Sequence, residues 1–188
     1  MDPELDRSKG VIELRAQPAP VELDGPWERF EALYRDARDD VYAYVATLLR
    51  DPAAAEDVTA LAFERAYRRR STFDRRRGVE RAWLFGIARN AALDELRRRQ
   101  RTAALVADPE DADAGSVADG AEVALRRTAV RSALATLSGR EREIVALKFH
   151  GGLTNGEIAR VLGISETAAG SLLYRTIEKL RRACDATA

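Results

Sequence analysis

Residues 138–182 constrain the fold most, because helix-start signals and a turn glycine follow one another at short intervals there. The segment Ser138-Gly-Arg-Glu141 is a capping box, in which the serine side chain accepts from the glutamate N–H and the glutamate side chain accepts from the serine N–H. The segment Thr154-Asn-Gly-Glu157 is a second capping box. Gly163 supplies the positive φ of a tight turn, and Ser165 is suited to cap the next helix. The segment therefore predicts three helices.

Two helices joined by a short glycine-containing turn are typical of a helix-turn-helix, whose second helix lies in a DNA major groove. We expect this second helix over residues 166–182. Its inward stripe would be Ala169, Leu173, Thr176 and Leu180, and its groove-facing stripe Thr167, Gly170, Ser171, Tyr174, Glu178 and Arg181.

Composition excludes several classes of protein. The 188 residues include one histidine and one cysteine, so no His/Cys metal cluster is available, and no Gly-rich phosphate loop occurs. We expect no enzyme activity and no cofactor, and we expect His150 to be either structural or merely exposed. No apolar run is long enough to span a membrane, and the start lacks a signal-peptide pattern. With the single Cys184, this predicts a cytoplasmic protein without membrane insertion.

The net charge of zero conceals an alternation along the chain. Residues 1–26 carry net charge −3, residues 27–101 carry +4, residues 102–122 carry −6 and residues 123–188 carry +5. This pattern predicts a flexible tail, a first domain, an acidic linker and a second domain at those boundaries. Two interpretations of this charge pattern stay open. Either the two basic modules bind one polyanion, or the charges of solvated arginine-rich helices simply offset those of acidic loops.

Helical periodicity in the first domain predicts helices over about 27–49, 53–70 and 80–101, with a loop over 71–79. The expected fold class is all-α, with two small helical domains joined by an acidic flexible linker, the second a helix-turn-helix. One stripe of the helix 80–101 carries Trp83, Asn90 and Arg97. An aromatic face among arginines suits single-stranded nucleic acid, although Trp83 could equally be a core aromatic with solvated arginines around it.

These residues carry a resemblance. The segments Ala55–Val58, Phe63–Tyr67, Phe73-Asp74, Trp83–Asn90 and Leu93-Asp94 resemble region 2 of the sigma-70 family, in its small extracytoplasmic-function (group four) form. The segments Ala133–Glu143, Gly152–Ala159 and Leu162–Ser165 resemble region 4 of that family. The resemblance covers about Phe30–Arg101 and Val123–Arg182, which is most of the chain.

The resemblance implies a factor that binds core RNA polymerase and directs it to promoter DNA, with an anti-sigma factor as a further partner. It also implies that the two modules pack together in the free state and hide their DNA faces. The implied minus-ten contacts are Arg75, Arg76, Arg77, Trp83, Arg89, Asn90, Asp94, Arg97 and Arg98, with Asp94 also able to orient an arginine. The implied minus-thirty-five contacts are Thr167, Ser171, Tyr174 and Arg175. The implied polymerase contacts are Asp57, Phe63 and Arg65.

The chain departs from the family at four positions. The family usually has Lys at position 170 and Arg at 172, where this chain has Gly170 and Leu172. Ala60 and Leu61 replace the usual Gln and Glu. These changes keep open a sigma-like protein repurposed for protein–protein interaction. A regulator of the response-regulator type is a further alternative, because its helix-turn-helix shares the residues around Glu141 and Glu157. Such a regulator would show a βαβ pattern or a ligand-binding pattern in its first half.

Overall fold

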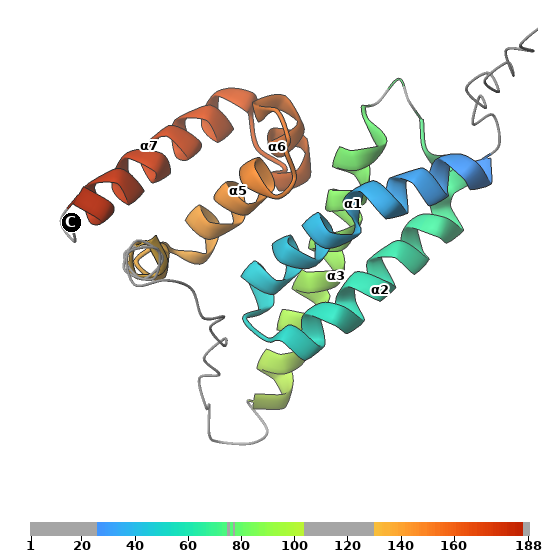
Figure 1. The fold of residues 1–188 in the computed structure, drawn as a ribbon, viewed down its shortest axis with the longest axis horizontal. Coiled ribbons are helices and arrows are strands. Elements are labelled where there is room, and N and C mark those ends of the chain that lie inside the picture. Colours follow the sequence, from blue (N-terminus) through green and yellow to red (C-terminus); the bar gives the residue numbers. More distant parts are fainter. Residues whose placement is uncertain (1–25, 75, 77, 104–129, 186–188) are drawn as a thin grey trace, which may run out of the picture.

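The computed structural model describes residues 26–74, 76, 78–103 and 130–185. The first half contains α1 (Pro26–Leu49), α2 (Pro52–Arg69), the 3-10 turn η1 (Arg70–Thr72) and α3 (Glu80–Ala103). The second half contains α5 (Gly139–Phe149), α6 (Asn155–Leu162) and α7 (Glu166–Asp185), preceded by a short helical piece over 130–135 (Figure 1). The described residues hold no strand, and the all-α prediction is confirmed. The predicted tail, except for Pro26 at the start of α1, and most of the predicted linker lie outside the described residues.

The helices α1, α2 and α3 pack against one another as a three-helix bundle (Figure 1). The break between α1 and α2 follows from local chemistry. Arg50 takes a positive φ of 54°, and the Asp51 side chain then accepts from the N–H of Ala54 at 3.1 Å to cap α2. Pro52 occupies the first helical turn, where its missing N–H costs nothing. The prediction of helix boundaries here is confirmed to within a residue or two.

The helix-turn-helix forms as the capping pattern predicts. Both capping boxes are present, with Ser138 and Thr154 as N-caps. Gly163 ends α6 with a φ of 66°, and the Ser165 hydroxyl accepts from the N–H of Ala168 at 3.1 Å. The turn between α6 and α7 is therefore fixed by backbone geometry that only glycine adopts without strain.

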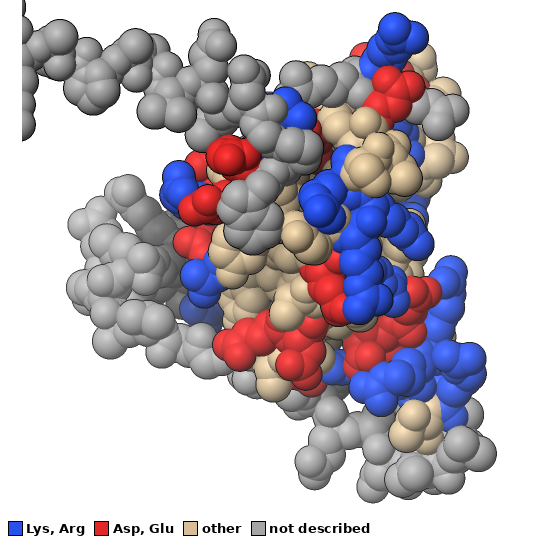
Figure 2. Space-filling view, turned by 90° about the vertical axis from the view of Figure 1, so that its right-hand side faces the viewer, with Lys and Arg blue, Asp and Glu red and all other residues tan. Residues whose placement is uncertain are grey.

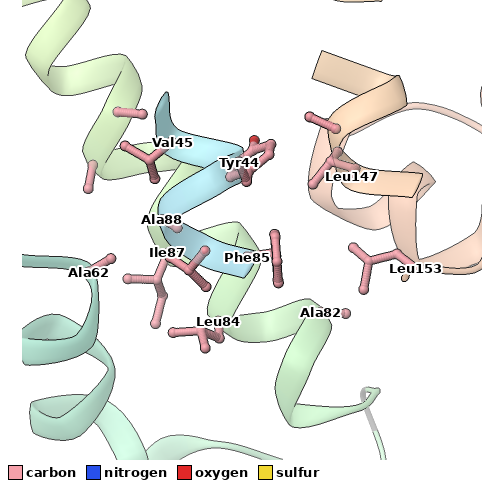
Figure 3. Close-up of a cluster of buried hydrophobic side chains, with 14 of the residues drawn as sticks. Tyr44, Val45, Ala62, Ala82, Leu84, Phe85, Ile87, Ala88, Leu147 and Leu153 are labelled. Atoms are coloured by element: carbon pink, nitrogen blue, oxygen red, sulfur yellow. The ribbon is translucent and has the colours of Figure 1, made fainter. Parts of the chain in front are cut away.

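The two halves pack together rather than standing apart. The helix α5 lies on α1, and α6 lies on α3 (Figure 1). The buried side chains form one continuous cluster, in which Tyr44 and Phe85 of the first half face Leu147 and Leu153 of the second (Figure 3). We call this packing the closed arrangement. No helix in the described part of the chain is long and apolar enough to cross a membrane.

Candidate nucleic-acid interface

Trp83 lies in the second turn of α3 with one side of its ring against the protein. The ring centroid is 5.3 Å from that of Phe73, and the two rings are tilted by 48°. A cavity of about 400 Å³ opens beside them, and Ile87 and the exposed Asn90 line it one and two turns further along α3. We call Phe73, Trp83, Ile87 and Asn90 the Trp83 face. It combines two aromatic rings with an amide that can donate and accept.

The far wall of this cavity comes from the second half of the chain. Arg160 and Val161 of α6 line it opposite Trp83 and Asn90. Gly78, in the loop before α3, has a φ of 147° and lies so close to the Arg160 guanidinium that a Cβ there would clash with it. In the closed arrangement, the Trp83 face is therefore partly covered by α6.

The predicted minus-ten arginines lie in different surroundings. Arg76 is exposed, and its N–H donates to the Asp74 carboxylate at 2.9 Å. Arg97 and Arg98 are exposed on α3 and pair with Asp94 and Glu95 one turn back. Hydrogen bonds from Arg98 and its neighbour Arg99 lower the pKa of Glu95 to about 2. Arg75 and Arg77 lie outside the described residues.

Arg89 is the exception, because it is paired across the closed arrangement. Its Nε donates to Glu143 of α5 at 2.6 Å, and the side chains are 18% and 9% exposed. Arg140 also donates to Glu143, at 3.2 Å. Burial, together with the negative charge of Glu143, raises the pKa of the neighbouring Tyr44 hydroxyl. Arg89 cannot reach DNA while this pair is formed.

Arg81 joins the same two halves of the chain by donating to backbone carbonyls. Its guanidinium donates to the carbonyls of His150 and Gly151, at 3.0 and 2.6 Å, where α5 ends. It also pairs with Asp40 of α1. A cation at a helix C-terminus satisfies carbonyls that have no partner within the helix. Sequence reasoning missed both Arg81 and Glu143, since nothing along the chain marks residues that pair across about 50–70 positions.

Asp94 accepts from two arginines. Its carboxylate binds Arg65 of α2 at 3.2 Å and Arg97 at 3.4 Å. The hypothesis that Asp94 orients an arginine agrees with these contacts. These contacts also place Asp94, an implied minus-ten residue, next to Arg65, which the resemblance assigns to the polymerase-binding surface.

The groove-facing side of α7 is exposed as expected. Thr167, Ser171, Tyr174 and Arg175 are all exposed, while Ala169, Leu173 and Thr176 are buried beneath them. Tyr174 is 68% exposed, which is high for an aromatic side chain. Leu172 is half-buried and packs against the core, so an apolar residue fits there. At Gly170, an added Cβ would approach only the Asn155 side chain, at 3.4 Å.

Residues 33–102 match the sigma-70 region 2 family, and residues 127–180 match the sigma-70 region 4 family. The ECF RNA polymerase sigma factor SigL of Mycobacterium tuberculosis is 32% identical over 151 residues, covering 80% of this chain and 85% of SigL. The chain belongs to the ECF group of the sigma-70 family. The ECF sigma factor BldN of Streptomyces coelicolor is 35% identical over 162 residues, which are 84% of this chain and 61% of the length of BldN.

Solved structures similar to this sigma factor have the same fold. The sigma factor RpoE, in complex with the anti-sigma factor NepR from Bartonella quintana, superposes with a TM-score of 0.65 at 20% identity, covering 84% of this chain and 98% of RpoE. CnrH, in complex with the cytosolic domain of CnrY, superposes with a TM-score of 0.61 at 26% identity, covering 88% and 94%.

The expected polymerase contacts of this sigma factor lie on α2 with unequal exposure. Asp57 is exposed, and the side chain of Arg65 is 35% exposed. Phe63 is buried, with its ring centroid 4.7 Å from that of Tyr34 and 6.5 Å from that of Phe30. Its position indicates that it supports the α1–α2 surface from below. Ala60 is exposed and Leu61 half-buried, which leaves this part of α2 poor in charge.

Proposed function

We propose that this ECF sigma factor binds core RNA polymerase in the cytoplasm and directs it to promoter DNA. The Trp83 face carries the proposal, because it presents two aromatic rings and an exposed amide within the sequence that matches region 2. Single-stranded DNA is held by base stacking on such rings, which contributes about 1–3 kcal/mol per base, and by cations on its phosphates.

At the minus-ten element, we assign Trp83 to base stacking and Asn90 to a base edge. Arg76, Arg97 and Arg98 are exposed and would contact phosphates. Arg75 and Arg77, in the same loop as Arg76, would contact phosphates as well. Arg89 would join them only after it leaves Glu143. None of these contacts requires the protein to form or break a covalent bond.

At the minus-thirty-five element, we assign Thr167, Ser171, Tyr174 and Arg175 to the major groove. Only Arg175 among them is charged, and it donates to the backbone carbonyl of Ser171 at 3.3 Å. Binding by this helix should therefore depend only weakly on salt, because few phosphate counterions are released. Asp57 and Arg65 would contact core RNA polymerase from α2.

The closed arrangement bears on regulation. Arg89 is sequestered by Glu143, and α6 lines the cavity beside Trp83. Contact of Arg89 with DNA, and full access to the Trp83 face, would thus require the halves to separate. We propose that an anti-sigma factor binds this protein and favours the closed arrangement; RpoE and CnrH, which share its fold, were solved as complexes with NepR and with the cytosolic domain of CnrY.

The direct test is reconstitution. The purified chain is mixed with core RNA polymerase and assayed by run-off transcription on genomic fragments from the source organism. We expect a stable complex and transcripts that start at a defined set of promoters. Failure to bind core polymerase would support the alternative of a sigma-like protein repurposed for protein–protein interaction. The uncharged residues at positions 170 and 172 favour that alternative. The response-regulator alternative has no support, because the described part of the first half is helical.

A further inference from the structure

A second cavity lies on the other side of Trp83, next to the start of α1. Its volume is about 340 Å³, and Phe30, Leu33, Phe73 and Trp83 give it an apolar wall. Its charged lining residues are Arg29, Arg70 and Glu80, two cations and one carboxylate. Neither arginine forms an ion pair with a carboxylate in the described part of the chain, although Arg70 lies 3.9 Å from the Tyr67 ring centroid and donates to the Tyr67 carbonyl. We call this space the N-terminal cavity.

Arginines outnumber carboxylates around the N-terminal cavity, although Glu80 lines it and Arg68 pairs with Glu64. Figure 2 shows the side of the molecule on which α1 begins and α2 ends, where Lys/Arg side chains lie beside patches of Asp and Glu. The end of α2 contributes Arg68 and Arg69 directly before Arg70. An apolar cavity lined by more arginines than carboxylates suits a segment that combines apolar and acidic side chains, since the apolar groups are buried and the carboxylates meet guanidinium groups.

The chain itself contains such a segment directly before α1 in the sequence. Residues 1–26 carry six acidic and three basic residues. Two short runs combine apolar and acidic side chains: Val11-Ile-Glu-Leu14, with one acidic residue, and Val21-Glu-Leu-Asp24, which alternates strictly. The complementary charge and the apolar side chains therefore occur together in sequence that leads directly into α1.

The distances also allow contact. Phe30 and Leu33 follow Pro26 by four and seven residues, which is about 6 and 10 Å along a helix. An extended segment spans about 3.3 Å per residue, so both runs can fold back over the first turns of α1. A covalent tether this short keeps the local concentration of the segment in the millimolar range, and even weak contacts are then occupied.

We propose that the acidic N-terminal segment, residues 1–25, binds in the N-terminal cavity and competes with single-stranded DNA for Trp83. The Trp83 ring borders both cavities, so a side chain held on one side restricts what can stack there. The competition with DNA rests on the function proposed above, whereas the docking of the segment does not.

Docking is tested first, without DNA. The full-length chain carries the photo-reactive residue p-benzoylphenylalanine in place of Leu23 or, in a second variant, of Leu14. After irradiation, mass spectrometry should find intrachain cross-links to residues 29–33, 70–73 or 80–83, and Arg29→Ala with Arg70→Ala should reduce them at least threefold. Cross-links spread evenly over the surface, or cross-links only between two copies of the chain, would overturn the proposal.

Competition is tested by fluorescence anisotropy with a labelled minus-ten single strand. Glu13→Gln, Glu22→Gln and Asp24→Asn together should tighten binding by the full-length chain about threefold to tenfold. The matched control neutralises Asp108, Glu110 and Asp111 of the linker, which changes the net charge equally. Equal gains in both variants would contradict competition at Trp83. Cross-links in the cavity from a chain that never binds the strand would leave the docking intact and refute the minus-ten assignment.

Discussion

At the scale of single residues, the pair Arg89–Glu143 decides whether a predicted DNA-binding cation is available. Both side chains are largely buried, and Glu143 accepts from Arg140 as well. A buried carboxylate keeps its charge only with such partners, because burial without them is costly. The same contact therefore stabilises the closed arrangement and withholds Arg89 from phosphates.

Replacing Glu143 with alanine should destabilise the protein. Arg89 would remain largely buried without its counter-ion, and we expect the free energy of unfolding to fall by about 2–4 kcal/mol. Glu178→Ala is the control, because its partner Arg181 is 69% exposed, and exposed pairs contribute about 0–1 kcal/mol. Denaturant titration measures both. A loss for Glu143→Ala no greater than that for Glu178→Ala would contradict the structural role of the buried pair.

The sequence predicts contacts between near neighbours far better than contacts across the molecule. The Ser138–Glu141 capping box joins residues three apart, and the pattern alone identifies it. The Arg89–Glu143 pair joins residues 54 apart, and each looks like an ordinary surface charge along its own helix. Trp83 and Asn90 were found because helical spacing brings them together. Phe63 was assigned to a surface by resemblance, and only packing against Tyr34 shows that it is buried.

At the scale of an element, α5 depends on its first turn. The Glu141 carboxylate accepts from Lys179 at 2.9 Å and from the Ser138 N–H at 2.7 Å. These bonds lower the pKa of Glu141 to about 2, and the Lys179 contact is the larger cause. The contact also joins the start of α5 to α7, so the cap holds the helix-turn-helix together.

This lowered pKa makes stability depend on pH in a defined window. A carboxyl whose pKa is lower in the folded state stabilises the protein above its unfolded pKa, about 4.3. That stabilisation is lost as pH falls from about 4.3 to 2. We expect the stability difference between the original chain and Glu141→Gln to shrink across this range, as measured by thermal denaturation. A difference that stays constant with pH would contradict the assignment.

The recognition helix α7 carries a glycine where its backbone has room for a side chain. A Cβ at position 170 would make only an ordinary contact with Asn155. Gly170→Ala should therefore raise the free energy of unfolding by about 1 kcal/mol. No gain in denaturant titration would show that the backbone at this position is not ordinary helix.

A cation at the same position should strengthen DNA binding. Gly170→Lys adds one phosphate contact, which should raise affinity for duplex DNA and steepen the slope of log K against log salt by about one unit. Ala53→Lys, which adds the same charge at an exposed position of α2 in the other half of the chain, tests whether any added charge has this effect. Equal slopes in the two variants would argue against groove docking at residue 170.

At the scale of the whole molecule, the closed arrangement joins the two halves through a shared core and the Arg81 contacts (Figure 3). Hydrogen bonds to a charged group contribute about 1.5–3 kcal/mol each. Arg81→Ala should therefore shift the balance toward separated halves by about tenfold or more. Fluorescence energy transfer between the single Cys184 and a cysteine placed at the exposed Arg68 would report the change. Arg35→Ala, in an exposed pair within α1, should leave the transfer unaltered.

The assignment of the Trp83 face to DNA is tested most directly by measuring promoter opening and polymerase binding separately. Both are measured in the Trp83→Ala and Asn90→Ala variants. Anisotropy measures the affinity for core RNA polymerase, and a fluorescent adenine analogue in the minus-ten element reports opening. We predict that each substitution reduces opening at least tenfold while the affinity for core polymerase changes less than threefold, because we assign base stacking to the Trp83 face and the polymerase contacts to α2. Equal losses of opening and of polymerase affinity would contradict the assignment of this face to DNA.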